Sequence, residues 1–204
     1  MNHPGTARHQ VTLGFFGQDG TCLSIRTTDM FQIRPFQSGD LPGIRYLHDW
    51  TPPAGTPTQD TPQQWFPDLD DIPTHYLAFW VVTVAAGDKE QVVGMVGIVS
   101  VDAHVPAGAI GDLRRPVRLQ RMRILPAFQR HGLGSRLVAT VIDWAEGHGA
   151  DGVILETTRQ QAGAVFLYRK RGFAVVWESQ RESWDVVWMR LGFRESGAPV
   201  ASEE

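Results

Sequence analysis

The chain has 204 residues, of which 42% are hydrophobic and 20% are charged, and its formal net charge is -3. This balance is typical of one folded domain with its own core, and it excludes a disordered chain, a collagen-like repeat and a coiled coil. The small net charge hides a separation of charge along the sequence. Residues 114–136 hold seven arginines and no acid, whereas residues 40–71 hold six aspartates and the single arginine Arg45. The sequence therefore predicts one basic and one acidic surface region.

Cysteine content and hydropathy limit where the protein works. The one cysteine, Cys22, excludes intrachain disulfides and a cysteine-based zinc site. The N-terminal residues lack the apolar run of a signal peptide, and no later segment reaches the roughly 18 apolar residues that cross a bilayer. We therefore expect a cytoplasmic protein that does not bind membranes.

In chain order, the spacing of apolar residues predicts strands and helices in alternation. Before residue 50 these are a hairpin of residues 11–16 and 21–26, a strand at 31–36 and a helix that begins at 38–40. Residues 51–73, rich in proline, threonine and aspartate, predict a loop or a short irregular helix. The later elements are an antiparallel hairpin of residues 76–86 and 91–101, strands at 117–125, 152–158, 174–178 and 185–191, and helices at 134–147 and 161–171. A loop that contains glycine and proline is predicted between residues 101 and 117.

This alternation, without a linker or an internal repeat, predicts a single α/β domain with a mixed sheet. We expect the domain to span residues 31–192, between an N-terminal extension at 1–30 and a flexible C-terminal tail at 193–204. For the hairpin in the extension, two alternatives stay open. It could extend the sheet, or it could cover a second copy of the chain in a homodimer.

The stretch RMRILPAFQRHGLGSR, residues 121–136, places a Gly-x-Gly turn between a strand and an amphipathic helix. The first amides of a helix have no partner within it, and together with the helix dipole they form an anion site. Glycine at 132 and 134 would let a phosphate reach the backbone. Arg130, His131 and Arg136 add side-chain donors beside that site. The alternative is a tight turn with a purely structural role.

Two absences narrow the class of ligand. The stretch contains no Gly-Lys-Ser/Thr, which excludes a P-loop, and Leu137 replaces the third glycine of a dinucleotide fingerprint. The turn therefore predicts a phosphorylated ligand of another kind.

Two motifs resemble a known family. Gln129-Arg130-His131-Gly132-Leu133-Gly134 fits the Gln/Arg-x-x-Gly-x-Gly/Ala motif of the GCN5-related N-acetyltransferases (GNAT). The run ILETTRQQAGAVFLYRKRGF, residues 154–173, resembles the strand and helix that follow in this family and their closing Leu-Tyr-x-x-x-Gly-Phe. The resemblance covers roughly residues 32–192. It implies the GNAT fold, a mixed and mostly antiparallel sheet with splayed central strands flanked by helices.

The resemblance implies acetyl-CoA as acyl donor and an amine as acceptor, with no metal. In the family, the pyrophosphate lies on the turn that matches residues 129–135, and the pantetheine arm pairs with the strand that matches residues 122–124. At Gln161 many members carry an asparagine that touches the cofactor. The cofactor-binding residues implied are Met122, Arg123, Ile124, Gln129, Arg130, His131, Gly132, Leu133, Gly134, Ser135, Arg136 and Gln161.

The remaining arginines have two interpretations. Clustered arginine is typical of nucleic-acid surfaces, but the sequence pI of about 6.2 and the lack of aromatic residues among the arginines argue against one. We expect no nucleic-acid partner. The arginines predicted to lie on a solvated strand face are Arg114, Arg115, Arg118 and Arg121.

The resemblance also implies a mechanism in which the amine attacks the thioester directly. A backbone amide near Ile124 would stabilise the oxyanion, and Tyr168 matches the tyrosine that protonates the departing thiolate as a general acid. The alternative for Tyr168 is packing beside Phe166 and Leu167. Arg118 stands where many members carry a glutamate base, so the base is open. Its candidates are a water chain, direct binding of the neutral amine, His75, His104 and Glu156.

The acceptor is less well defined. In the family, specificity depends on the region that matches residues 48–71 and on the loop between the last two strands, which matches roughly residues 179–184. The aspartates there, with Trp50, Trp65 and Phe66, favour a cationic or aromatic amine. Alternatively, the tryptophans belong to the core or a lid and the aspartates cap helices. The competing function, suggested by the missing strand carboxylate, is a non-catalytic coenzyme A-binding sensor or interaction domain.

Overall fold

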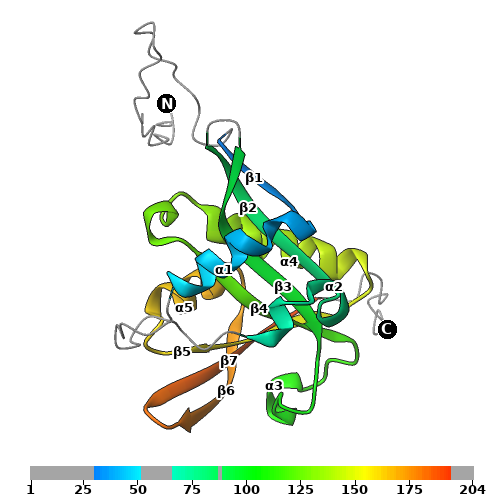
Figure 1. Ribbon diagram of the computed structural model, residues 1–204. Coiled ribbons are helices and arrows are strands. Elements are labelled where there is room, and N and C mark those ends of the chain that lie inside the picture. Colours follow the sequence, from blue (N-terminus) through cyan, green and yellow to red (C-terminus); the bar gives the residue numbers. More distant parts are fainter. Residues whose placement is uncertain (1–29, 52–65, 87–88, 194–204) are drawn as a thin grey trace, which may run out of the picture.

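The computed structural model describes residues 30–51, 66–86 and 89–193 (Figure 1). In these ranges, one mixed sheet of seven strands runs in the order β1-β2-β3-β4-β5-β7-β6. Among the described strands, β4 and β5 are the only parallel neighbours. The predicted mixed, mostly antiparallel sheet is confirmed. Its strands are β1 (Phe31–Pro35), β2 (Ala78–Ala86), β3 (Lys89–Ser100), β4 (Pro116–Ile124), β5 (Gly152–Thr158), β6 (Ala174–Arg181) and β7 (Trp184–Gly192).

Helices cover both faces of this sheet. Figure 1 shows α1 in front of the central strands and α4 behind them. On one face, Gly43 of α1 lies so close to β3 that a Cβ would stand 2.8 Å from the Val92 Cβ. On the other face, Trp144 of α4 packs edge-on against Trp80 of β2. The helices are α1 (Leu41–Asp49), α2 (Ile72–His75), α3 (Ala107–Ile110), α4 (Leu133–Gly147) and α5 (Ala162–Lys170).

The pattern of apolar residues explains the long elements. In α4, Leu137, Val138, Val141 and Ala145 recur at helical spacing and are fully buried against the sheet. In β2 and β3, continuous apolar runs pair antiparallel from Ala78↔Ile98 to Ala86↔Lys89. The predicted helices in α1, α4 and α5 and the predicted strands in β1 to β7 are confirmed within a few residues.

The central strands separate as the fold implied. β4 pairs with β5 only from Pro116↔Gly152 to Leu119↔Leu155, although both strands continue beyond these pairs. Past that point β4 stays paired with β3 as far as Ile124, and β5 stays paired with β7. The separation leaves an opening between the second half of β4 and the second half of β5. The expected splay is confirmed.

Two expectations about loops are wrong. The segment between β3 and β4, predicted as a loop, contains the short helix α3. The predicted loop at residues 179–184 is mostly strand, because β6 continues to Arg181 and β7 begins at Trp184. Backbone pairing needs no apolar side chains, and on this edge strand the polar side chains of Ser179 and Gln180 are exposed.

Several predictions fall outside the described residues. These are the N-terminal hairpin, Cys22, Trp65 and the C-terminal tail. The domain boundaries at 30 and 193 therefore stay predictions. Among the described helices, none is long and apolar enough to cross a membrane.

The contact between Gly97 of β3 and the ring of Tyr76 generates a stability prediction. A Cβ at position 97 would lie 2.4 Å from the Tyr76 ring and 2.8 Å from Phe79, so the buried rings must move. We expect Gly97→Ala to lower the free energy of unfolding by about 1–3 kcal/mol in urea titrations. The matched control is Gly163→Ala in α5, where a Cβ meets nothing within 4 Å. An equal loss in both variants would contradict the contact as the cause.

Candidate active site

The turn that precedes α4 has the open geometry of an anion site. A 3-10 turn at Pro126–Phe128 leads to Arg130 and Gly132, both in the left-handed region with φ of 66° and 77°. A Cβ on Gly132 would meet no atom within 4 Å, so the backbone there is accessible. Glycine at 132 thus suits both the turn conformation and close approach of a ligand to the first amides of α4.

Gly134 lies in a different environment. A Cβ at this position would stand 3.0 Å from Leu167 Cδ2 and 3.2 Å from Met122 Cε. The small residue therefore lets α4 pack closely against α5 and β4. Phosphate access at Gly134 stays a prediction, but packing is a sufficient physical reason for the glycine.

The side chains predicted to bind phosphate do not all gather at the turn. Arg130 is exposed there. The Arg136 guanidinium instead donates to the Phe31 carbonyl of β1 at 3.3 Å, and His131 lies 5.8 Å from the Phe31 ring. Gln129 Nε2 donates to the Ile124 carbonyl at 3.1 Å. Leu133 is buried, which leaves its backbone as the part that a ligand could contact, and Ser135 is half-buried.

Tyr168 lies where the structure separates β4 from β5. Its hydroxyl donates to Met122 Sδ at 3.4 Å, and its ring contacts Phe173 rather than Phe166, which is 70% exposed. Burial raises the pKa of the Tyr168 phenol. The phenol is therefore neutral at physiological pH and can donate a proton.

Gln161 stands at the start of α5, beside the end of β5. Its side-chain oxygen accepts a hydrogen bond from Thr157 Oγ1 at 2.7 Å. This contact fixes the amide at the junction of β5 and α5, next to the opening.

Strand β4 carries a bulge at the opening. Met95 pairs with Arg123 and Gly97 with Gln120, so Arg121 and Met122 together oppose the single residue Val96. Arg121 has a φ of 55°, a conformation that costs a residue with a Cβ about 1–3 kcal/mol and persists only where its surroundings hold it.

The bulge directs Arg121 and Met122 to opposite faces of the sheet. Met122 faces Tyr168, whereas Arg121 faces the segment that contains α2. Its Nε and Nη2 donate to the two Asp68 carboxylate oxygens at 3.0 and 2.9 Å. The guanidinium also lies 3.6 Å from the centroid of the Phe66 ring. The predicted solvated position of Arg121 is therefore wrong, because the fold brings an aspartate and an aromatic ring to it.

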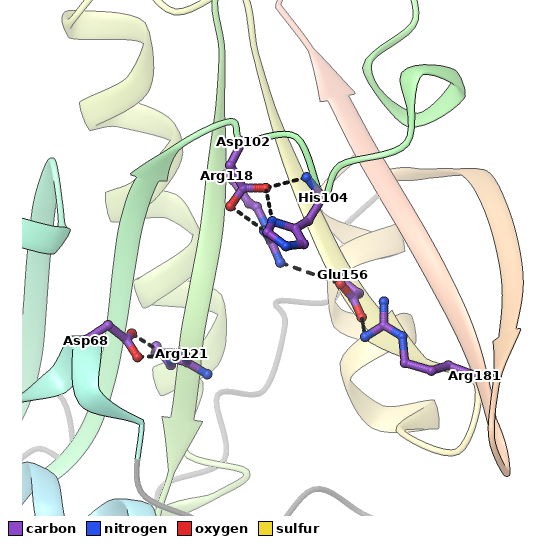
Figure 2. A network of polar contacts seen from close by, with 7 residues as sticks. All are labelled: Asp68, Asp102, His104, Arg118, Arg121, Glu156 and Arg181. Carbon is purple, nitrogen blue, oxygen red and sulfur yellow. Dashed lines mark hydrogen bonds and ion pairs between the residues drawn. The ribbon is translucent and has the colours of Figure 1, made fainter.

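Arg118 is also not on a solvated face. Its side chain is 14% exposed and lies 3.4 Å from Asp102 and 3.5 Å from Glu156. Figure 2 shows Arg118 in contact with both carboxylates. The guanidinium is 5.1 Å from the centroid of the Trp188 ring. The two carboxylates come from the neighbouring strand β5 and from the segment after β3, and both reach the Arg118 guanidinium on β4. The sequence pattern does not indicate these contacts. Arg114 and Arg115 are exposed as expected, but they lie just before β4 rather than on it.

A pocket of about 490 Å³ lies on the α2 side of β4. It is bounded by the end of β3, the segment that contains α2, and the first residue of the β4 bulge. The pocket thus lies on the opposite face of β4 from Tyr168. Its lining residues are Asp68, Pro73, Thr74, His75, Tyr76, Leu77, Val99, Ser100, Asp102, Gln120 and Arg121.

Among the described aspartates of the predicted acidic region, three lie against arginines, which neutralise part of its charge. Asp40 lies 2.8 Å from Arg34, Asp70 lies 2.7 Å from Arg45 and Asp68 lies 2.9 Å from Arg121. The alternative, that these aspartates cap helices, is confirmed for Asp71, which accepts from the backbone of Thr74 at the start of α2.

The three candidate bases lie in different places. Glu156 is the first residue of β5 past its last pair with β4, and Arg118 and Arg181 hold its carboxylate at 3.5 and 3.3 Å. His104 is 89% exposed and lies 3.4 Å from Asp102. His75 lines the pocket, and its Nδ1 lies 2.9 Å from the Asp71 carbonyl oxygen.

Sequence reasoning missed Asp68, Tyr76 and Arg181 as members of the site. The signal available for Asp68 was its place in an acidic segment, and nothing in the pattern indicated its partner. Within the described ranges, no group of three or more His, Cys, Asp or Glu side chains is placed to hold a metal ion.

Comparison with known proteins agrees with this geometry. Human N-acetyltransferase 8 is 34% identical over 131 residues, which cover 61% of this chain and 51% of that protein. The chain thus spans about half the length of the curated relatives it matches.

Two solved structures share the fold. The ribosomal-protein-S18-alanine N-acetyltransferase from Escherichia coli has a TM-score of 0.59 at 19% identity, covering 84% of this chain and 99% of that one. Arabidopsis thaliana NAA60 in complex with acetyl-CoA has a TM-score of 0.62 at 18% identity, covering 79% and 98%. The model of the acetyltransferase (GNAT) family matches residues 44–173. Since this match spans more than half of the sequence, the chain belongs to the GNAT acetyltransferase family.

Proposed function

We propose that the chain is an acetyl-CoA-dependent N-acetyltransferase that moves an acetyl group to the amine of a small molecule or a peptide. The observation that carries this proposal is the opening between β4 and β5, which has the α4 turn and Tyr168 on one side and a pocket on the other. Such an opening lets a thioester and an amine meet from opposite faces of the sheet. The names of the relatives support the same activity.

The residues present fit acetyl-CoA. The first amides of α4, which have no partner within the helix, and the exposed Arg130 side chain would hold the pyrophosphate. The backbone of residues 122–124 would pair with the pantetheine arm. Arg123 would contribute its backbone alone, because its guanidinium donates to the carbonyls of His48 and Thr51 at 3.1 and 2.5 Å. When bound, acetyl-CoA supplies the thioester carbonyl that the amine attacks.

Tyr168 is the proposed general acid. Its neutral phenol lies beside β4 at the opening, where it can deliver its proton to the departing sulfur. A backbone amide near Ile124 would stabilise the negative charge on the carbonyl oxygen.

Glu156 is the proposed general base. It lies on β5 at the start of the opening, and its carboxylate is 24% exposed, which leaves it accessible to an amine. The two arginines hold the carboxylate in one position. In the reaction the amine nitrogen bonds to the carbonyl carbon, its proton passes to Glu156, the bond from carbon to sulfur breaks, and the sulfur takes the Tyr168 proton.

The pocket beside the β4 bulge is the proposed acceptor site. Its carboxylates, Asp68 and Asp102, both face arginines, so the pocket holds balanced charge rather than an acidic lining. This weakens the expectation of a strongly cationic acceptor.

The homodimer and the cytoplasmic location stay predictions.

The activity is tested by release of free thiol from acetyl-CoA over a panel of amino acids, polyamines, aminoglycosides and peptides with free N-termini. We expect release with at least one amine, and an acetylated product of matching mass. Binding of coenzyme A without thiol release on any acceptor would instead favour a non-catalytic coenzyme A-binding domain.

Tyr168→Phe keeps the buried ring and removes the proton that we assign to the thiolate. On an active acceptor we expect kcat to fall about 100-fold while the KM for acetyl-CoA stays within about twofold. Tyr46→Phe is the control, since Tyr46 is 48% exposed on α1 and the same hydroxyl is removed there. Full turnover in Tyr168→Phe would refute the assignment of the acid.

Glu156→Gln removes the carboxylate and keeps the shape of the side chain. We expect kcat to fall about 100-fold near neutral pH. The difference in kcat between the unchanged protein and Glu156→Gln should narrow as the pH rises toward about 10, because the amine then loses its proton to solvent. The control is Glu178→Gln on the edge strand β6, which removes a carboxylate that is 47% exposed and pairs with Arg159. A loss that is the same at every pH would argue against the role of base.

A further inference from the structure

We infer that Asp68 and Arg121 form a clamp that holds the β4 bulge and so positions the strand that faces the acetyl-transfer opening. The two residues are positioning residues for the transfer reaction, and this inference rests on the proposed function. Below, the Asp68–Arg121 pair is called the clamp.

The conformation of Arg121 shows that the bulge needs an external support. Arg121 adopts a φ of 55° in the middle of a strand, although it carries a Cβ. Residues held in this way persist where the surrounding structure determines them, and they occur preferentially at functional sites. Without such support, β4 would have a lower free energy in an extended conformation that is in register with β3.

The clamp supplies this support from three directions. Two guanidinium nitrogens donate to both Asp68 oxygens, and the plane of the guanidinium rests on the Phe66 ring. The Tyr76 hydroxyl donates to the same carboxylate and lies 3.3 Å from Arg121 Nε. The pair is largely shielded, with side chains 21% and 22% exposed. Bidentate pairing fixes both the distance and the plane of the guanidinium.

The same cluster also touches the partner strand. The Tyr76 ring packs on Gly97, which is the β3 residue paired with Gln120 at the edge of the bulge. The segment at residues 66–76 therefore contacts both strands at the irregularity. Burial by itself would raise the pKa of Asp68, but hydrogen bonds from Arg121 and Tyr76 hold this pKa below its usual value. The carboxylate therefore stays charged at neutral pH.

The bulge decides which β4 residue faces Tyr168. With the extra residue in place, Met122 lies against the Tyr168 hydroxyl and Arg123 faces the end of α1. A strand that loses its bulge shifts by one residue and exchanges its two faces. Release of the clamp would therefore turn Met122 and its neighbouring amides away from the thioester.

The first experiment compares Asp68→Asn, Arg121→Gln and the double variant with the control Asp70→Asn. Asp70 belongs to the same segment, but its ion pair with Arg45 is more than half exposed. We expect each clamp variant to lower kcat at least tenfold and also to raise the KM for acetyl-CoA, because the displaced backbone of residues 122–124 is the proposed partner of the pantetheine arm. The kcat of the double variant should be no lower than that of the less active single variant, because the two residues act as one unit. A kcat within twofold of the control would overturn the inference.

A second comparison separates backbone support from general loss of a side chain. Arg121→Gly removes the Cβ that opposes a positive φ, whereas Arg121→Ala keeps it. We expect the glycine variant to keep more activity than the alanine variant. In an ordinary strand position alanine is the better residue, so the opposite order would contradict a strained bulge held by the clamp.

A third measurement does not depend on turnover. Amide hydrogen exchange of residues 120–124 should be at least tenfold faster in Asp68→Asn than in Asp70→Asn, with thermal unfolding confirming that both variants fold. Equal exchange in the two variants would overturn the clamp. A protein that acetylates no amine yet shows the faster exchange would refute the proposed function and retain the clamp as a structural device.

Discussion

Strand β4 separates from β5 while it remains bound to β3, and the candidate site depends on this difference between its two edges. On the β3 side the ladder continues through the bulge to Ile124, and on the β5 side it ends at Leu119. One strand thus serves as part of the core along its first half and as a wall of the opening along its second. The first half of β4 anchors the second half, because Val117 and Leu119 are buried in the core on a strand that α4 contacts.

Charge in this protein is organised by pairing rather than by region. Along the sequence, acids and arginines are separated, and this separation predicts two surfaces of opposite sign. In the fold, Arg121 of the basic stretch meets Asp68 of the acidic stretch. A charge run read from sequence gives the composition of a segment, but the sign of a surface depends on which segments lie together.

Elements with a long apolar period were predictable from the sequence. The strand at Gly152–Thr158 and the helix at Leu133–Gly147 follow directly from their buried faces. The helix α3 was not predictable, because a single turn is too short to show a period. The end of β6 escaped prediction because its exposed polar residues carry no alternation, although the backbone still pairs.

The site was predictable where it is local and not where it is assembled from distant segments. The turn with Gly132 and the helix with Tyr168 each lie within one motif, so their residue types and order identified them. Asp68 and Arg121 are separated by 53 positions, and their contact depends on the left-handed residue in β4. No pattern of hydrophobic or charged residues encodes that conformation for an arginine.

Gly134 gives the two halves of the opening a common mechanical link. Its missing side chain lets α4 contact Leu167, the residue immediately before Tyr168 on α5, and also Met122, the sulfur partner of Tyr168. A change in the position of the α4 turn is therefore transmitted by van der Waals contact to the helix that carries the proposed acid. Filling of the proposed anion site and alignment of the proposed proton donor would then be coupled, because the missing side chain of Gly134 sets the distance between the two helices.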